Sequence, residues 1–293
     1  MLEILNLTKN YRNVTAIDNL SFTVNRGRVF GLLGPNGAGK TTTIRIILDI
    51  IKPSDGTVKF DGTLVNNRFQ DIVGYLPEER GLYKKSKVID VIEYLAKLKN
   101  MPARASLLNA HALMEKLDVW QYKDRRIEEL SKGNQQKIQF ITALVHKPEI
   151  LILDEPFSGL DPINQKMIRE ILLEFIDNGK IVILSTHLLE MAEFIVEDIL
   201  LLNNGKNILS GSLKEIKKQF SKNSYRIEFT GNVQKLESIP GVIIKIIGNN
   251  SAEITLRDLT SSQFLKDASS LIDINHFSYI EPTLKNIFLE TIK

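Results

Sequence analysis

Residues 34–41 read Gly34-Pro35-Asn36-Gly37-Ala38-Gly39-Lys40-Thr41 and match the pattern G-x-x-x-x-G-K-[ST]. Glycines at this spacing let the backbone curl around an anion with its N–H groups pointing inward. The apolar run 28–33 before the loop is typical of a buried strand, and residues 42–48 after it have the apolar spacing of a helix. Because the pattern requires a strand, a glycine-rich loop and a helix in this order, we interpret 34–41 as a phosphate-binding P-loop rather than an ordinary turn.

Two residues of the loop are expected to act through their side chains. Lys40 would reach the β- and γ-phosphates of a bound nucleotide, and the Thr41 hydroxyl would take a place on Mg²⁺. The loop and the start of the following helix form the expected nucleotide-binding set. This set comprises Gly34, Pro35, Asn36, Gly37, Ala38, Gly39, Lys40, Thr41 and Thr42.

The composition limits the classes of function. A net charge of +3 over 293 residues gives no basic stripe, so nucleic acid is not expected as the main partner. The chain has no cysteine, which excludes disulfides and sulfur-ligated metal sites. No stretch approaches the roughly 18 consecutive apolar residues of a membrane-crossing helix. The chain could still lie against a membrane through a partner.

The order of the predicted elements indicates an α/β core followed by a smaller module. The apolar runs 150–153 and 181–184 are typical of buried parallel strands, and helices alternate with them. A helical lobe is expected over about 80–140, with one helix burying a face of Leu107, Ala110, Leu113 and Leu117. From 219 a βαββαβ order suits a ferredoxin-like α+β module. We therefore expect domains at 1–218 and 219–293.

Two acidic residues follow the apolar run 150–153 directly. Asp154 would end a strand beside the P-loop strand, where its carboxylate could hold Mg²⁺ directly or through water. Glu155, next in line, could orient and polarise a water for attack on the γ-phosphorus. The alternative is a pair of acids that begins a surface loop, and the four apolar residues before them argue against it.

Further motifs accompany the P-loop in a fixed order. They are Leu130-Ser131-Lys132-Gly133-Asn134-Gln135-Gln136, Leu151-Ile152-Leu153-Asp154-Glu155-Pro156, Ser158-Gly159-Leu160-Asp161 and Ser185-Thr186-His187. Over residues 1 to about 215 the chain resembles the ATP-binding cassette (ABC) family, the ATPase subunits of ABC transporters. The resemblance implies a P-loop NTPase fold with an inserted helical subdomain, ATP and Mg²⁺ as cofactors, and catalytic roles for Lys40, Glu155 and His187. Tyr11 stands where the family places an aromatic residue that stacks on adenine.

The segment that resembles the family signature suggests a dimer. Ser131 and Gly133 begin a predicted helix, so their hydroxyl and N–H groups form an anion site remote from the P-loop. A two-fold dimer would present Ser131 of one subunit to the γ-phosphate held by Lys40 of the other. The partner would be a second copy or a related ATPase. His187 follows a buried strand and could bond the γ-phosphate and keep the water in place.

This chain departs from the family pattern at two places. The signature usually has Gly and Gln where Lys132 and Asn134 stand here, and we expect this to be tolerated because Ser131 and Gly133 remain. In the loop that joins the core to the helical lobe, Glu78 occupies the position of a usual Gln. Glu78 could contact Mg²⁺ or the water, but its negative charge near three phosphates could alter the magnesium dependence or the rate.

Residues 74–83 and 281–288 resemble one subgroup, the sodium- and drug-exporter-like ATPases of ABC-2 type exporters, which carry a C-terminal accessory domain. The leading hypothesis is thus a cytoplasmic ATPase, peripheral on the inner face of the cell membrane, that drives a separate membrane permease for export.

One alternative is a soluble ABC ATPase that acts on ribosomes or DNA. Such proteins usually carry two cassettes or long coiled-coil insertions, and neither is found. A regulatory cassette with little hydrolysis is the other alternative: Glu78 keeps it open, while an intact Lys40, Asp154, Glu155 and His187 argue against it.

Overall fold

The computed structural model describes residues 1–66, 68–79 and 81–291, which divide into two compact units. The first unit is Met1–Leu213 and the second is Lys214–Lys293. The sequence placed the boundary between 218 and 219, at the end of helix α7 (Leu213–Gln219) and not at its start. Arg80, part of the segment compared with the exporter subgroup, lies outside the described residues.

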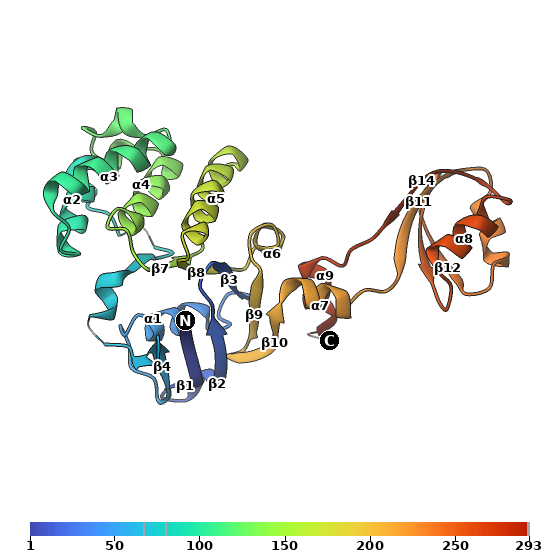
Figure 1. Cartoon of the computed structure of the whole chain (residues 1–293), viewed down its shortest axis with the longest axis horizontal. Coiled ribbons are helices and arrows are strands. Elements are labelled where there is room, and N and C mark those ends of the chain that lie inside the picture. Colours follow the sequence, from blue (N-terminus) through green and yellow to red (C-terminus); the bar gives the residue numbers. More distant parts are fainter. Residues whose placement is uncertain (67, 80, 292–293) are drawn as a thin grey trace. The chain divides into compact units, whose positions relative to one another are not determined.

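Two sheets build the first unit (Figure 1). An antiparallel sheet has the order β2-β1-β4-β5, and a six-stranded sheet has the order β10-β9-β3-β8-β7-β6. In the larger sheet β9, β3, β8, β7 and β6 are parallel, and β10 is an antiparallel edge strand. The strands are β1 Leu2–Tyr11, β2 Val14–Val24, β3 Arg28–Leu33, β4 Asp55–Phe60, β5 Thr63–Leu64, β6 Val73–Leu76, β7 Ile150–Asp154, β8 Ile181–Thr186, β9 Asp198–Asn203 and β10 Lys206–Ser212.

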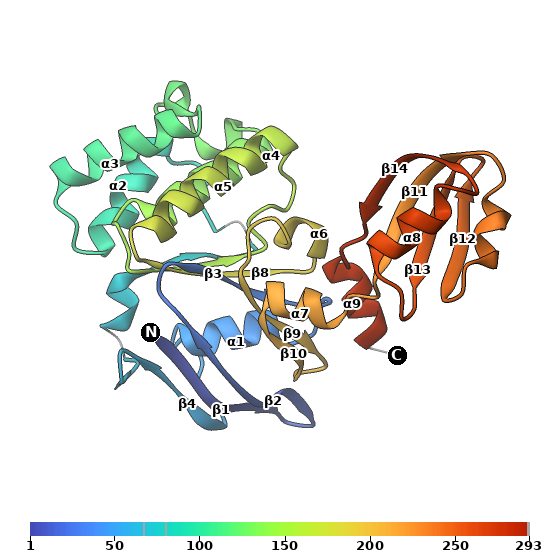
Figure 2. The same ribbon diagram turned by 45° about the vertical axis from the view of Figure 1, so that its right-hand side comes forward.

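Helices lie on both faces of the larger sheet. Figure 2 shows α4 and α5 on one side of β3 and β8, with α1 and the smaller sheet on the other side. Helices α2, α3 and α4 pack together as the inserted helical subdomain that the sequence predicts. The helices are α1 Lys40–Ile47, α2 Val88–Leu98, α3 Ala103–Lys116, α4 Lys132–Leu144, α5 Pro162–Asp177 and α6 Leu189–Ala192, with 3-10 turns η1 Phe69–Ile72, η2 Trp120–Tyr122 and η3 Ile127–Glu129.

The main core lies between the two sheets, with α1 inside it. It joins apolar side chains from β1, β2 and β4 to those of α1 and of one face of the larger sheet, such as Ile44, Ile152 and Ile183. Every residue of β7 and β8 is buried, as expected for parallel strands covered on both faces. Burial of one such aliphatic side chain contributes about 1.5–3 kcal/mol. The P-loop at the end of β3 is therefore held on a rigid support.

Two details of the first unit differ from the sequence-based expectation. Strand β7 is not beside the P-loop strand, because β8 lies between β3 and β7. Helix α3 buries Ser106, Ala110 and Met114, spaced four residues apart, while Leu107 is exposed. Of the four residues expected on the buried face, Ala110 and Leu117 are buried and Leu113 is half-buried, whereas Leu107 is exposed and Ser106 and Met114 are buried instead.

The second unit has the ferredoxin-like topology that the sequence predicts. Its sheet order is β12-β13-β11-β14 and all neighbours are antiparallel. The elements are α7 Leu213–Gln219, β11 Ser224–Thr230, η4 Val233–Ser238, β12 Val242–Gly248, β13 Ser251–Leu256, α8 Ser261–Ala268, β14 Asp273–Tyr279 and α9 Leu284–Thr291. Apolar residues of one sheet face pack with η4 and α8 into a separate core that includes Phe229 and Phe264. Across both units, no helix formed by the described residues is long and apolar enough to cross a membrane.

Candidate nucleotide site

The P-loop encloses the side chain of its own lysine. Gly39 caps α1 with φ of 107°, and a Cβ atom there would lie 2.7 Å from the carbonyl oxygen of Ala16, so only glycine fits. Lys40 is 6% exposed, and its Nζ donates hydrogen bonds to the carbonyl oxygens of Gly34 (2.8 Å) and Pro35 (3.1 Å). Burial lowers the pKa of Lys40, and the nearby carboxylates act in the opposite direction. The ammonium group thus lies inside the curve of the loop.

A cavity of about 320 Å³ opens next to the P-loop. It brings together the loop, the start of α1, the loop after β6 and the end of β7. Its lining residues are Ala16, Asn36, Gly37, Gly39, Lys40, Thr41, Thr42, Glu78, Asp154 and Glu155. The expected metal-binding and water-orienting carboxylates therefore face the same space as the P-loop. The other expected residues are not among its lining residues: Gly34, Pro35 and Ala38 of the loop itself, and Tyr11, Ser131, Gly133 and His187.

Asp154 is linked to the P-loop helix across the intervening strand. Its side chain is 1% exposed, and Oδ2 accepts a hydrogen bond of 3.0 Å from the Thr41 hydroxyl. Its Oδ1 accepts a hydrogen bond from the Ser185 hydroxyl on β8. Because the side chain of Ser185 is small, Asp154 at the end of β7 can reach Thr41 across β8, although β7 does not lie beside β3. Sequence reasoning gave Ser185 no role of its own.

Glu155 is surrounded by donors from the end of β8. It is 4% exposed and adopts the left-handed backbone region with φ of 53°, an uncommon conformation for a residue with a side chain. Its Oε1 accepts from the backbone N–H of His187 (2.9 Å) and from His187 Nδ1 (2.7 Å), which places the imidazole proton on Nδ1. Its Oε2 accepts from the Thr186 hydroxyl at 2.7 Å. The Lys40 Nζ lies 3.9 Å from Oε1.

Thr186 was missed by sequence reasoning, although it stands directly before the histidine that was chosen. A hydroxyl at the end of a buried strand, next to a candidate catalytic histidine, is the signal that could have found it. The imidazole of His187 contacts Glu155 and is partly exposed, at 41% of its side chain.

The remaining expected residues lie apart from this cavity. Tyr11 ends β1 with an exposed ring, and Lys9 Nζ lies 5.1 Å from the ring centroid. Ser131 is exposed and caps α4, its hydroxyl oxygen accepting a hydrogen bond of 3.2 Å from the backbone N–H of Asn134. Gly133 follows in the first turn of the same helix. In one chain the signature segment and the P-loop are therefore separate surfaces.

Comparison with known proteins decides the family. The family model described as "ABC transporter" matches residues 17–158, and the model described as "ATP-binding protein DrrA1-3-like, C-terminal domain" matches residues 211–292. The chain is 38% identical over 296 residues to the uncharacterised ABC transporter ATP-binding protein YhaQ of Bacillus subtilis (strain 168), covering 100% of this chain and 98% of that protein. The chain belongs to the ABC transporter ATP-binding proteins.

Other similarities agree with this assignment. The chain is 33% identical over 219 residues to the Nod factor export ATP-binding protein I of Ralstonia nicotianae, covering 74% of this chain and 68% of that protein. A solved structure described as the ATP binding subunit of an ABC transporter superposes with a TM-score of 0.70 at 28% identity, covering 75% of this chain and 93% of that chain. As an ABC transporter ATP-binding protein, this chain binds ATP and is an ATPase.

The donor set of this ABC protein fits a magnesium ion. Thr41, Asp154 and Glu78 line the cavity and offer hydroxyl and carboxylate oxygens, the ligands Mg²⁺ prefers, and Thr41 and Asp154 are hydrogen-bonded to each other. No group of three or more His, Cys, Asp or Glu side chains in the described ranges could hold a metal alone. When bound, a magnesium ion neutralises charge on the β- and γ-phosphates.

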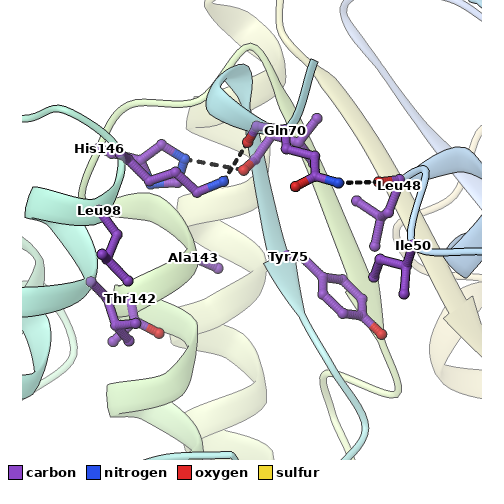
Figure 3. A pocket seen from close by; sticks show the side chains of 11 residues that line it. Leu48, Ile50, Gln70, Tyr75, Leu98, Thr142, Ala143 and His146 are labelled. Carbon is purple, nitrogen blue, oxygen red and sulfur yellow. Dashed lines mark hydrogen bonds between the residues drawn. The ribbon is translucent and has the colours of Figure 1, made fainter. Parts of the chain in front are cut away.

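A second cavity, of about 240 Å³, lies between the helical subdomain and the core of this ABC protein (Figure 3). Its lining residues are Leu48, Ile50, Gln70, Val73, Tyr75, Leu95, Leu98, Lys99, Thr142, Ala143 and His146. His146 Nε2 donates to the Val73 carbonyl at 3.2 Å, and its Nδ1 is buried without a hydrogen-bond partner among the described residues. Burial, with a smaller contribution from the charge of Lys99, lowers the pKa of His146 to about 4.

Proposed function

We propose that this ABC transporter ATP-binding protein hydrolyses Mg²⁺–ATP as a dimer and drives a separate membrane permease, for export, from the inner face of the cell membrane. The observation that carries the hydrolytic part is the buried Glu155, which lines the P-loop cavity and is held by hydrogen bonds to both of its oxygens. A regulatory cassette with little turnover would not need a carboxylate fixed in this way.

Each residue of the cavity has a separate role in hydrolysis. Lys40 exchanges its carbonyl partners for the β- and γ-phosphates, and the P-loop N–H groups bind further phosphate oxygens. Thr41, Asp154 and Glu78 would hold Mg²⁺. Glu155 accepts the proton of the attacking water, because Oε1 accepts two hydrogen bonds whereas Oε2 accepts one and keeps a lone pair. His187 keeps Glu155 oriented through its Nδ1–H, and it would bond the γ-phosphate through Nε2–H when the ring is doubly protonated.

The dimer would complete the site. Ser131 and Gly133 stand at the N-terminus of the 13-residue helix α4, where the helix dipole and free N–H groups favour an anion. They do not line the P-loop cavity of their own chain. A second copy, or a related ATPase, would bring them to the γ-phosphate held by Lys40. The exposed ring of Tyr11 would stack on adenine.

The second cavity would receive a cytoplasmic segment of the permease. Its wall combines apolar side chains of the core, such as Ile50, with Leu95 and Leu98 of α2. An apolar side chain of the permease could fill it, and β6 at its floor leads directly to the loop of Glu78. Export is supported by the relative whose name states export of Nod factors and by the match of the C-terminal module.

Measurement of ATP hydrolysis with the Glu155→Gln variant tests this function. We expect the wild-type chain to hydrolyse ATP only with Mg²⁺. The variant should lose about 100-fold or more of the turnover, the usual contribution of a general base, and should still bind ATP by equilibrium dialysis. Glu253→Gln, in the second unit, is the matched control and should behave as the wild type. Unchanged turnover of Glu155→Gln would refute the role given to Glu155.

A further inference from the structure

One buried side chain holds the backbone on both sides of Glu78. Gln139 on α4 is 3% exposed, and its Nε2 donates to the carbonyl oxygens of Pro77 (3.2 Å) and Glu79 (3.1 Å). These are the residues immediately before and after Glu78, which lines the nucleotide cavity. The position of Glu78 is therefore tied to α4 through a single amide group.

The orientation of this amide follows from its surroundings. Two carbonyl oxygens face the same end of the side chain, and only the NH₂ group can donate to both. Its Oε1 is buried and has no hydrogen-bond partner in the described part of the chain. Buried amide oxygens normally accept a hydrogen bond, so the residue keeps its place here through the nitrogen alone.

Gln139 lies between the two cavities. The Thr142 hydroxyl, one turn along α4, donates to the backbone carbonyl of Gln139 at 2.7 Å, and Thr142 lines the second cavity. Helix α4 also touches β6 closely, since a Cβ atom at Gly74 would lie 2.0 Å from the carbonyl oxygen of Ala143. Close-packed contacts of this kind transmit displacement rather than absorb it.

We propose that Gln139 is a positioning residue that holds Glu78 in the lining of the nucleotide cavity and passes movement of α4 to it. The inference rests on the proposed function to the extent that Glu78 acts on Mg²⁺ or on the attacking water. Because Ser131 caps the N-terminus of α4, a shift of this helix on dimerisation or on permease binding would reach Glu78 through the same amide.

The test uses Gln139→Met, which keeps the length of the side chain and removes the donor. In hydrogen exchange of the whole chain without nucleotide, the backbone amides between residues 74 and 79, all but that of Pro77, which has no N–H, should exchange about five- to tenfold faster, as expected for a lost hydrogen bond. Asn109→Leu is the matched control, because its amide donates to the Val145 carbonyl (3.0 Å) in the same subdomain. This control should leave the exchange of residues 74–79 unaltered.

A second readout separates positioning from a purely structural role. The Mg²⁺ concentration that gives half-maximal ATP hydrolysis should rise at least about threefold in Gln139→Met, as expected for loss of one oriented oxygen ligand. In a Glu78→Gln background the same substitution should add no further change, because it acts through Glu78. The control Asn109→Leu should keep the wild-type dependence in both backgrounds.

Two results would overturn the inference: unchanged exchange of residues 74–79, or an equal shift in Mg²⁺ dependence with and without Glu78. Failure of the proposed function is visible separately. A wild-type chain without Mg²⁺-dependent hydrolysis would contradict that function, whereas the exchange measurement needs no turnover and still decides whether Gln139 holds the loop.

Discussion

Burial of the carboxylate of Glu155 would be costly if its oxygens were unpaired. Thr186 and His187 donate hydrogen bonds to the two oxygens of Glu155. Thr41 and Ser185 donate in the same way to the two oxygens of Asp154. Hydrogen bonds to an ionised acceptor in a low-dielectric interior are strong, and they fix the acceptor before substrate arrives. The neighbouring carboxylates of Asp154 and Glu155 are therefore pre-organised, because each is held by its own set of hydrogen-bond donors.

His146 gives a prediction about pH. Its pKa is about 4 in the folded chain, below the ordinary value of 6.5, so between these values the unfolded chain binds a proton that the folded chain does not. The contribution of neutral His146 is fully present above pH 6.5 and is lost as pH falls toward 4. Between pH 7 and pH 5 the wild type should lose about 1–2 kcal/mol more stability than His146→Asn in urea unfolding. Equal losses in both proteins would contradict the assignment.

Helix α4 connects the parts of the first unit that matter for function. Its N-terminus carries Ser131, its middle carries Gln139, and its C-terminal turn lines the second cavity with Ala143. It also packs closely on β6 at Gly74. One element thus contacts the loop of Glu78 and the expected surface for the permease, and it carries the residue expected to meet the phosphate of a second subunit.

Replacement of Gly74 should disturb this packing. A Cβ atom there would lie 2.0 Å from the backbone oxygen of Ala143, and a backbone atom cannot move away cheaply. Gly74→Ala should lower the free energy of unfolding of the first unit by about 2 kcal/mol or more. Gly81→Ala is the control, because no atom lies within 4 Å of the added methyl group. Equal urea midpoints for the two variants would show that α4 and β6 are not closely packed in solution.

The short-range sequence pattern predicted which segments form helices and strands better than it predicted which strands lie side by side in the sheet. The apolar runs, the P-loop and the capped start of α4 have short-range physical causes, and they were found from sequence. The insertion of β8 between β3 and β7 depends on long-range pairing, which a run of apolar letters does not specify. The roles of Ser185 and Thr186 depend on that insertion. The contacts of Gln139 likewise join segments 60 residues apart.

The two units have separate hydrophobic cores, one built around α1 and the larger sheet and one around α8 and the second unit's sheet. All residues of the nucleotide cavity belong to the first unit. The second unit matches the family model described as "ATP-binding protein DrrA1-3-like, C-terminal domain". The hydrolysis proposed for this chain therefore belongs to the first unit.

Removal of one core side chain should therefore affect one unit alone. Phe264 is fully buried in the second unit, and Phe264→Ala should cost that unit about 3–5 kcal/mol. Scanning calorimetry of the whole chain should show one transition moved to lower temperature and another unchanged. Basal ATP hydrolysis should stay at the wild-type level. A common shift of all thermal transitions would mean that the units unfold together.

The most direct test of the proposed function is a detergent pull-down of the tagged Glu155→Gln variant in the presence of Mg²⁺ and ATP. This substitution should keep ATP bound and so preserve the assembled state. We predict that a multi-span membrane protein is recovered with the chain. Recovery of ribosomal proteins or nucleic acid without any membrane protein would contradict the proposal and favour a soluble ABC ATPase.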